Sequence, residues 1–362
     1  MIVTSEAHLA ETLRGATTPF AVVGGGTRGV APSGGGEALD ISAMSQVALY
    51  EPETLTLVAG AATPLSQITD LLAAHGQRLA FEPPDWRGLL ATGGKPTIGG
   101  VIAANLSGPR RIQAGAARDA LLGVRFVDGT GAIIRNGGRV MKNVTGYDLV
   151  RLMAGSWGTL GVLTEVALKT QPAPPAAATL VWQDRSVAEA AELMRLALAT
   201  PYEVNGAARL PDGTVLARVE GFAASVSYRA GRLADTLGAD RVEEGGALWH
   251  AVSNVAPFHG QVGDVWRFSV PPSDAPAIVA RLPSDVLLDW GGGLIWALLP
   301  EGSDGRALAA PYRGHALLVR ASAETRRRLP RFEPEDPAVA CLTAGLRARF
   351  DPRALLNPGL MG

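Results

Sequence analysis

The sequence predicts an α+β protein with about two domains, and three observations lead to this prediction. The chain has 362 residues, of which 47% are hydrophobic and 19% charged, a composition typical of globular domains of roughly 150 residues each. Glycines cluster between short apolar runs in the first 165 residues. After a Pro/Ala-rich segment at 171–178, strand patterns alternate with helix patterns, which favours a sheet covered by helices on one face.

The elements expected before residue 171 are short. Ser5 is a suitable N-cap for a helix over 7–13, and a helix over 65–75 has Pro64 in its first turn and Gly76 at its end. The turn residues 128–131 predict a hairpin. We expect strands at 20–23, 47–50, 55–59, 121–127, 132–135 and 160–170, and a short helix at 147–153.

Residues 171–178 are the best candidate for a linker. Beyond them we expect strands at 179–182, 207–210, 215–220, 265–270, 286–290 and 294–298, and helices at 187–198, 223–237 and 338–350.

Composition excludes several classes of function. The net charge is −1 and no basic face is evident, so no nucleic-acid partner is expected. Cys341 is the single cysteine, which rules out a disulfide framework or a cysteine-held metal centre within the chain. We find no secretory signal and no run of ~18 apolar residues. The expected location is cytoplasmic, with at most peripheral contact with the inner membrane through partner subunits.

The loop at 24–29 has the spacing G-x-G-x-x-G, with glycines at Gly24, Gly26 and Gly29. That motif binds dinucleotides when a helix follows it directly. Here Pro32 and three consecutive glycines at 34–36 follow, and these residues are poor helix formers. The Rossmann interpretation therefore fails, which leaves either a backbone nest for a phosphate group or a plain tight turn.

A second anion-binding segment favours the phosphate interpretation. Thr97 is a suitable N-cap, and small residues follow it at 98–100. Free amides at a helix start attract phosphate, and glycine permits close approach of a ligand. The two segments could therefore hold one pyrophosphate from opposite sides.

These motifs, with those at 39–42, 56–61, 108–119 and 155–166, stand in the order found in a known family. Over roughly residues 1–172 the chain resembles the FAD-binding domain of the vanillyl-alcohol oxidase type. The resemblance implies a two-subdomain FAD-binding domain at 1–172 and a smaller α+β cap domain with an antiparallel sheet at 173–335. A C-terminal helix and tail at 336–362 would return to the FAD domain.

Three further motifs, at 143–149, 289–292 and 350–359, resemble the FAD-linked oxidase branch that contains D-lactate and glycolate oxidases. Within this branch the chain is similar to the smaller flavin subunits of bacterial glycolate oxidase complexes. The resemblance implies an FAD-dependent oxidoreductase subunit and a small 2-hydroxy acid as the substrate of the complex. It also implies two partners, a larger paralogous flavin subunit and an iron–sulfur subunit.

The resemblance also implies which residues contact the cofactor. Amides of the first loop would hold one side of the FAD pyrophosphate, and the second segment the other side. Val162 would meet the adenine edge through its backbone, and Asn357 would approach the flavin ring, although a simple Asn-Pro turn explains Asn357 equally well. The expected FAD-binding residues are Gly24, Gly25, Gly26, Thr27, Arg28, Gly29, Thr97, Ile98, Gly99, Gly100, Asp119, Gly155, Ser156, Gly158, Gly161, Val162 and Asn357.

Covalent members of this superfamily attach the flavin through His or Cys, which the loop at 24–29 lacks, so the FAD is expected to be non-covalent. Catalytic relatives carry a Gly-Asp-Gly-Asn-His stretch that helps to bind a divalent metal. Residues 290–297 lack those ligands, so no metal is expected. In the family a cationic residue usually follows Asn-Pro-Gly, whereas Leu360 stands at that position here.

The catalytic residues are therefore unknown from the sequence. His259 and Arg267 are the candidates, and Arg209 and Arg218 could also hold a carboxylate, although structural roles explain all four. Two hypotheses follow. In one, the flavin oxidises glycolate to glyoxylate or relays electrons from the larger flavin subunit to the iron–sulfur subunit. In the other, the chain is an assembly subunit whose FAD is structural. A stand-alone oxidase of another hydroxy substrate is a further alternative.

Overall fold

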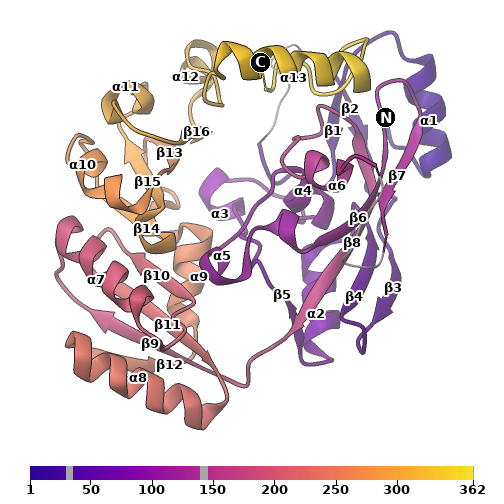
Figure 1. Cartoon of the computed structure of the whole chain (residues 1–362). Helices are drawn as coiled ribbons and strands as arrows, with labels where there is room; N and C mark the ends of the chain where they lie inside the picture. Colours follow the sequence, from indigo (N-terminus) through magenta and orange to yellow (C-terminus); the bar gives the residue numbers. More distant parts are fainter. Residues whose placement is uncertain (30–35, 139–145, 362) are drawn as a thin grey trace.

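The computed structural model describes residues 1–29, 36–138 and 146–361. It contains a six-stranded and an eight-stranded antiparallel sheet, and a small parallel pair (Figure 1). Helices and strands are mixed along the chain, so the predicted α+β class and antiparallel cap sheet are confirmed. No helix in these ranges combines the length and apolar character needed to cross a bilayer.

The chain begins with a helix and a parallel strand pair. Ser5 caps α1 (Glu6–Gly15) by accepting a hydrogen bond from the amide of His8. The strands β1 (Phe20–Val23) and β2 (Glu37–Asp40) then pair in parallel. The strand β2 was not predicted, and the segment 30–35 between the two strands lies outside the described residues.

The six-stranded sheet has the order β3-β4-β8-β6-β7, with β5 paired to the far end of β8. Its hairpin is held by Asp128, whose Oδ1 accepts hydrogen bonds from the amides of Thr130 and Ala132. The strands are β3 (Val47–Glu51), β4 (Thr56–Gly60), β5 (Gln77–Leu79), β6 (Leu121–Val127), β7 (Ile133–Gly137) and β8 (Val162–Pro172). The helices of this part are α2 (Leu65–Ala73), α3 (Arg87–Leu90), α4 (Ile98–Ala103), α5 (Arg111–Ala114) and α6 (Leu149–Met153).

The eight-stranded sheet has the order β12-β9-β11-β10-β14-β15-β13-β16. Its strands are β9 (Ala176–Trp182), β10 (Gly206–Arg209), β11 (Val215–Gly221), β12 (Arg241–Glu244), β13 (Asp264–Ser269), β14 (Val286–Asp289), β15 (Leu294–Leu299) and β16 (His315–Arg320). The helices are α7 (Val187–Ala199), α8 (Ala223–Leu237), α9 (Ala247–Asn254), α10 (Ala275–Val279), α11 (Gly305–Ala309) and α12 (Ala323–Arg328).

Both faces of the eight-stranded sheet are buried. In β15, Ile295 and Ala297 belong to the core beneath the helices, whereas Leu294 and Trp296 belong to the core shared with the first half of the chain. The helices α7 and α8 cover the outer face (Figure 1). Because side chains alternate along a strand, one face is left to meet the glycine-rich half. The expectation of helices on one face is confirmed.

Two features of the predicted layout need correction. Of the Pro/Ala-rich segment 171–178, the first two residues belong to β8 and the last three to β9, so only 173–175 connects the sheets. The strands β5, β12 and β16 were also missed. The C-terminal helix fits better, since α13 (Pro337–Phe350) matches the predicted bounds of 338–350 within one residue.

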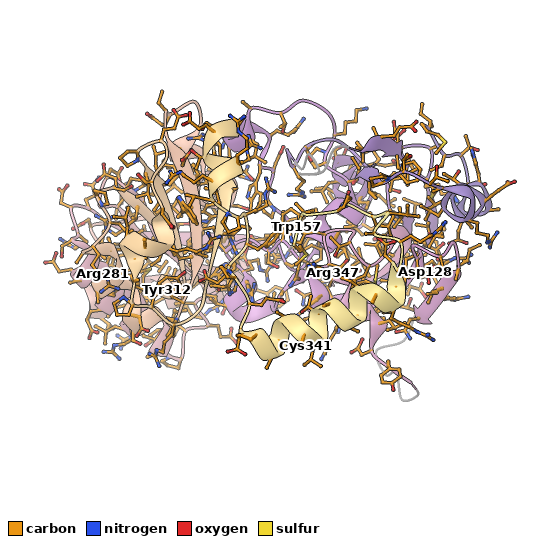
Figure 2. All side chains as sticks on the ribbon, turned by 90° about the horizontal axis from the view of Figure 1, so that it is seen from above. Asp128, Trp157, Arg281, Tyr312, Cys341 and Arg347 are labelled. Carbon is orange, nitrogen blue, oxygen red and sulfur yellow. The ribbon has the colours of Figure 1, made fainter. Side chains whose placement is uncertain are left out.

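The C-terminal tail returns to β1. The amide of Phe20 donates to the carbonyl of Leu355 at 2.7 Å, and the amide of Asn357 donates to the carbonyl of Phe20 at 3.0 Å. Figure 2 shows α13 lying across one side of the molecule, with Arg347 and Cys341 on it. The last described residues are thereby fixed beside the glycine loop that follows β1.

A buried ionic network joins the two sheet regions. Arg218 of β11, only 2% exposed, donates from Nη1 and Nη2 to the carboxylate of Glu82 at 2.8 and 3.0 Å, and from Nε to Asn205 at 2.8 Å. Arg78 pairs with Glu220 at 3.0 Å in the same network. Burial outweighs the attraction of Arg218 and raises the pKa of Glu82.

We predict that Arg218→Met destabilises the chain by roughly 3–5 kcal/mol, because the substitution leaves the partly buried Glu82 carboxylate without its main partner. The measurement is the free energy of unfolding in urea. Arg195→Met is the control, because Arg195 pairs with Glu192 on an exposed helix surface. A loss no larger than that of the control would contradict a buried network that holds the two sheets together.

Candidate functional site

The glycine loop after β1 packs backbone against backbone. A Cβ on Gly25 would lie 1.7 Å from the carbonyl oxygen of Lys95, and one on Gly94 would lie 2.0 Å from that of Gly25. Gly26 and Gly29 have φ angles of +66° and +57°, which side-chain-bearing residues rarely adopt. Glycine is therefore required here by close approach and by backbone conformation.

The amides of this loop are available for a ligand. Within the described residues, none of the N–H groups of Gly25, Gly26, Thr27, Arg28 and Gly29 donates a hydrogen bond to the protein. Successive free amides around a concave turn form an anion-binding nest. The structure thus agrees with the nest interpretation of this loop and does not require a plain turn.

The second segment differs from expectation. Thr97 caps α4 as predicted, and its Oγ1 accepts from the amide of Gly100 at 3.3 Å. The amide of Ile98 donates to Thr63 at 3.1 Å and that of Gly99 to Ala61 at 2.7 Å. The helix-start amides are therefore already used, and the expectation of free amides here is wrong. A Cβ on Gly99 would lie 2.6 Å from Ala61, so the glycine serves close packing.

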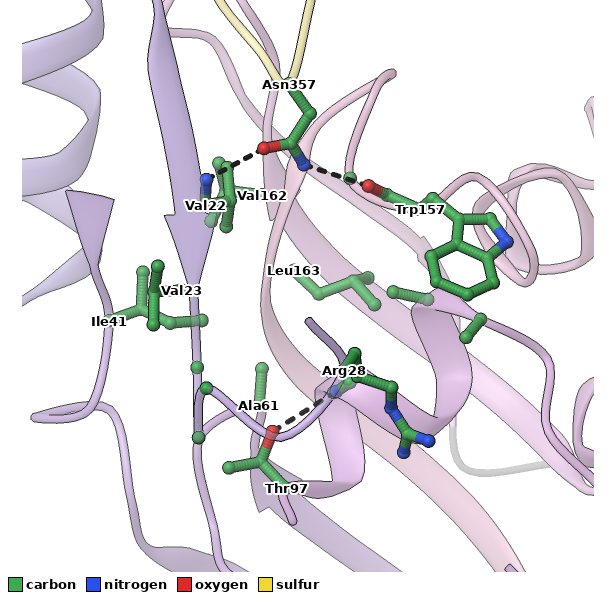
Figure 3. Close-up of a pocket in the computed structure, with 18 of the residues that line it drawn as sticks. Val22, Val23, Arg28, Ile41, Ala61, Thr97, Trp157, Val162, Leu163 and Asn357 are labelled. Carbon is green, nitrogen blue, oxygen red and sulfur yellow. Dashed lines mark hydrogen bonds between the residues drawn. The ribbon is translucent and has the colours of Figure 1, made fainter. Parts of the chain in front are cut away.

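A cavity of about 350 Å³ lies between the two segments (Figure 3). Most of the residues expected to bind the cofactor line it. They are Gly24, Gly25, Gly26, Thr27, Arg28, Gly29, Thr97, Gly99, Gly100, Gly158, Gly161, Val162 and Asn357.

Four of the expected residues do not line this cavity. Ile98 is fully buried in the core. Asp119 accepts from the amide of Ala116 at 2.9 Å and so closes a local turn. The amide of Gly155 donates to Ile102 at 3.1 Å, and the hydroxyl of Ser156 donates to the Met153 carbonyl at 2.9 Å. These groups hold the segments behind the cavity wall.

Sequence reasoning missed the apolar part of the lining. These side chains come from six separate places along the chain, and no local pattern marks any of them as a ligand contact. Val22 and Val23 lie in β1, and Ile41 directly follows β2. The missed lining residues are Val22, Val23, Ile41, Ala61, Ala103, Ala104, Trp157 and Leu163.

Asn357 lines the cavity, but the polar atoms of its side chain are hydrogen-bonded to the protein. Its Oδ1 accepts from the amide of Val22 at 2.8 Å, and its Nδ2 donates to the carbonyl of Trp157 at 2.9 Å (Figure 3). The side chain therefore ties the C-terminal tail to both walls of the cavity.

A row of aromatic rings and guanidinium groups leads from the cavity to the inner face of the eight-stranded sheet. The Arg28 guanidinium lies 5.7 Å from the Trp86 ring, and Trp86 meets Trp296 edge-on at 5.4 Å. Arg267 lies 5.9 Å from the Trp296 ring. Burial lowers the pKa of both Arg28 and Arg267 to about 10.

The three candidate arginines of the sheet have different partners. Arg218 is held by Glu82, and Arg209 donates from Nε to the carbonyl of Arg185 at 3.0 Å. Within the described residues Arg267 makes no hydrogen bond or ion pair, and its recorded contacts are with the rings of Trp290 and Trp296. Of the three, Arg267 alone uses none of its guanidinium nitrogens within the described residues, whereas Arg209 uses its Nε.

His259 has a structural environment. Its Nε2 lies 2.8 Å from the carbonyl oxygen of Asn254, and a Cβ on Gly88 would lie 2.3 Å from its ring. It does not line the cavity. No cluster of three or more His, Cys, Asp or Glu side chains suited to a metal occurs in the part of the chain that the structure describes.

Asp289 is a buried acid at the end of β14, 2% exposed. Its Oδ1 accepts from the amide of Trp290 at 2.7 Å, which starts the turn through the glycines at 291–293. Burial raises the pKa of Asp289 to about 7, against the lowering effects of this hydrogen bond and of nearby Arg218 and Arg267. The Asp-Trp-Gly-Gly motif at 289–292 thus has a structural role in the turn. Residues 143–145 of the motif at 143–149 lie outside the described residues.

Comparison with known proteins gives a consistent family. Residues 1–137 match the family described as FAD binding domain. The chain is 36% identical to the glycolate oxidase subunit GlcE of Escherichia coli over 335 residues, which is 90% of this chain and 87% of that protein. It is 37% identical to the glycolate oxidase subunit GlcD of Bacillus subtilis over 166 residues, 45% of this chain and 34% of that protein.

A solved structure of alkyldihydroxyacetonephosphate synthase shares the fold. The TM-score is 0.70 at 15% identity, and the match covers 99% of this chain and 76% of that one. At this identity the likeness concerns the arrangement of the backbone alone.

We predict that Asp289→Asn stabilises the chain at pH 8 by ~2–4 kcal/mol. Because the folded-state pKa is raised, the favourable contribution of the neutral acid is complete below the ordinary pKa of 3.8 and is lost as the pH rises through about 7. The asparagine amide stays neutral and keeps an oxygen for the Trp290 amide. Melting temperatures between pH 5 and 8 test this, with the exposed Asp285→Asn as the control. A gap between variant and wild type that does not widen with pH would contradict the assignment.

Proposed function

The chain belongs to the family of the glycolate oxidase subunit GlcE, and from this we propose that it is the FAD-binding subunit of a complex that oxidises glycolate or a related 2-hydroxy acid. Its FAD is redox-active in that complex. The observation that carries this proposal is the loop of free amides at 25–29, which opens onto a 350 Å³ cavity. When bound there, FAD supplies a two-electron acceptor.

The described residues fit FAD in a specific way. The free amides of Gly25, Gly26, Thr27 and Arg28 hold the pyrophosphate, and the unpaired Arg28 guanidinium adds positive charge. Gly100 lets the cofactor approach α4 closely, Gly99 packs α4 against Ala61, and Val162 offers backbone to the adenine. Gly158, Gly161 and Asn357 complete the wall, while Ile98, Asp119, Gly155 and Ser156 position these segments from behind.

The FAD is held without a covalent bond. The cavity lining contains neither His nor Cys, and Cys341 is exposed on α13. Every contact proposed above is a hydrogen bond, a charge interaction or apolar packing. The flavin should therefore dissociate when the fold is lost.

We propose that electrons leave through a partner or a small diffusible acceptor. No group of side chains suited to a metal occurs in the described ranges, so the chain offers no second redox centre there. We propose a larger paralogous flavin subunit and an iron–sulfur subunit as partners. A GlcD protein is 37% identical to this chain over 45% of this chain's length, which supports the paralogous partner. The complex would lie in the cytoplasm, with any contact with the inner membrane made through partners.

One observation supports a second candidate function. Residues 290–297 form a turn and a strand built from glycines and apolar residues, and they supply no metal ligand or general base for the substrate hydroxyl. In this alternative the larger subunit performs the oxidation. The FAD described above then relays electrons, or it serves only to stabilise the assembly.

We predict that Gly25→Ala lowers the FAD content of the purified chain at least tenfold, because its Cβ would collide with the carbonyl of Lys95 and displace the loop. The matched control is Gly93→Ala, where a Cβ meets nothing within 4 Å. FAD is measured in the supernatant after acid precipitation. Full FAD content in Gly25→Ala would count against this loop, and flavin retained on the precipitated wild-type chain would contradict non-covalent binding.

The redox role is tested by anaerobic addition of glycolate to the isolated FAD-loaded chain and to the complex it forms in its host. In the complex we expect this chain's flavin to lose the absorbance of oxidised flavin at about 450 nm, since both candidate electron routes pass through this flavin. Bleaching in the isolated chain assigns the oxidation to this subunit. Flavin that stays oxidised during turnover of the complex would overturn the redox role and leave the structural one.

A further inference from the structure

Two arginines from distant parts of the chain meet at one tryptophan. Arg111, at the start of α5, has its guanidinium carbon 4.4 Å from the centre of the Trp290 ring. Arg267, in the middle of β13, lies 5.1 Å from the same ring. Trp290 is held in place because its Nε1 donates to the carbonyl of Gly108 at 3.0 Å. Both cations therefore contact the same indole, and the charge of Arg111 acts on Arg267.

Neither cation is neutralised by the protein. Within the described residues Arg111 and Arg267 have no hydrogen bond or ion pair from their side chains. Burial lowers the pKa of both guanidinium groups. Repulsion from Arg111 lowers the pKa of Arg267 further. Repulsion from Arg118 does the same for Arg111, against the raising effect of Asp119. Asp289 attracts Arg267 but forms no ion pair with it among the described residues. Burial raises the pKa of Asp289 to about 7. A desolvated pair of like charges is unfavourable unless a ligand supplies the opposite charge.

A chain of three contacts links the pair to the proposed flavin cavity. Arg267 contacts Trp296, Trp296 meets Trp86, and Trp86 contacts Arg28, which lines the cavity. A ligand held by the pair would therefore occupy the space between the cofactor cradle and the inner face of the eight-stranded sheet. A substrate must lie in that region to exchange electrons with the flavin.

We propose that Arg111 and Arg267 together bind the carboxylate of a small organic acid, and that this chain recognises the acid with two guanidinium groups and no metal ion. Guanidinium groups bind carboxylates through paired, charge-assisted hydrogen bonds. Trp290 contacts both groups and gives the site an apolar neighbour. The choice of a carboxylate rests on the proposed function, whereas the need for an anion follows from the unpaired cations.

The test is isothermal titration calorimetry of the FAD-loaded chain with oxalate, which imitates a two-carbon acid without reducing flavin. Glycolate is titrated in parallel, and neutral glycolamide and inorganic phosphate serve as comparison probes. We expect Arg111→Gln and Arg267→Gln each to weaken oxalate binding about 10–100-fold. Arg209→Gln, in the same sheet but bonded to the carbonyl of Arg185, should bind oxalate as the wild type does.

A second readout separates binding from folding. Because each variant removes an unpaired cation, its melting temperature should equal or exceed that of the wild type, and its FAD content should be unchanged. Oxalate binding that is unaffected by both substitutions, or absent from the wild type at millimolar concentration, would overturn the proposal. Loss of FAD with unchanged oxalate binding would assign the pair to the cofactor instead, and phosphate or glycolamide binding as tight as oxalate would exclude carboxylate selectivity.

This test is independent of the redox experiment. If oxalate binds at the arginine pair but glycolate never bleaches the flavin, the carboxylate site stands and the redox function fails. If the flavin is reduced while neither arginine affects oxalate binding, the site fails and the redox function stands.

Discussion

The close approach of two backbone segments is the constraint on which the rest of the structure depends. Gly25 and Gly94 pack so tightly that a Cβ on either would overlap a carbonyl oxygen of the other segment. This contact aims the free amides of the loop into the cavity. Asn357 then ties the C-terminal tail to the strand before the loop and to Trp157, so the cavity is closed by residues more than 300 positions apart in the chain.

The groups that suit the cofactor are different from the groups that could take part in a reaction. The cradle uses backbone amides and small residues, which suit an anionic cofactor without specifying a reaction. The space beside it contains arginines without ion pairs in the described residues, although the whole chain has a net charge of −1. They are Arg28, Arg111, Arg267 and Arg331, the last of which lies 5.7 Å from the Trp157 ring of the cavity wall. Such a gathering of unpaired cations costs stability, and bound anions would offset that cost.

Local sequence predicts elements with strong local signals. Ser5 and Thr97 cap the helices as expected, and the hairpin at 128–131 has its predicted turn. The strand β12 was missed because its exposed, charged residues show no apolar alternation, and β2 because its pairing with β1 is decided by tertiary contacts. Whether the first amides of α4 are free could not be predicted locally, because their acceptors are the carbonyls of Ala61 and Thr63, which lie in another segment. Likewise, Arg209, Arg218 and Arg267 look alike in sequence and differ only through distant partners.

The most direct test of the account is the number of cofactors in the assembly that this chain forms. The tagged chain is purified with its partners, and FAD and iron are counted against the amount of each subunit. The account predicts one FAD on this chain, a second on the paralogous flavin subunit, and iron in a third subunit. A fully active chain that elutes alone, or a complex in which this chain carries no FAD, would contradict it.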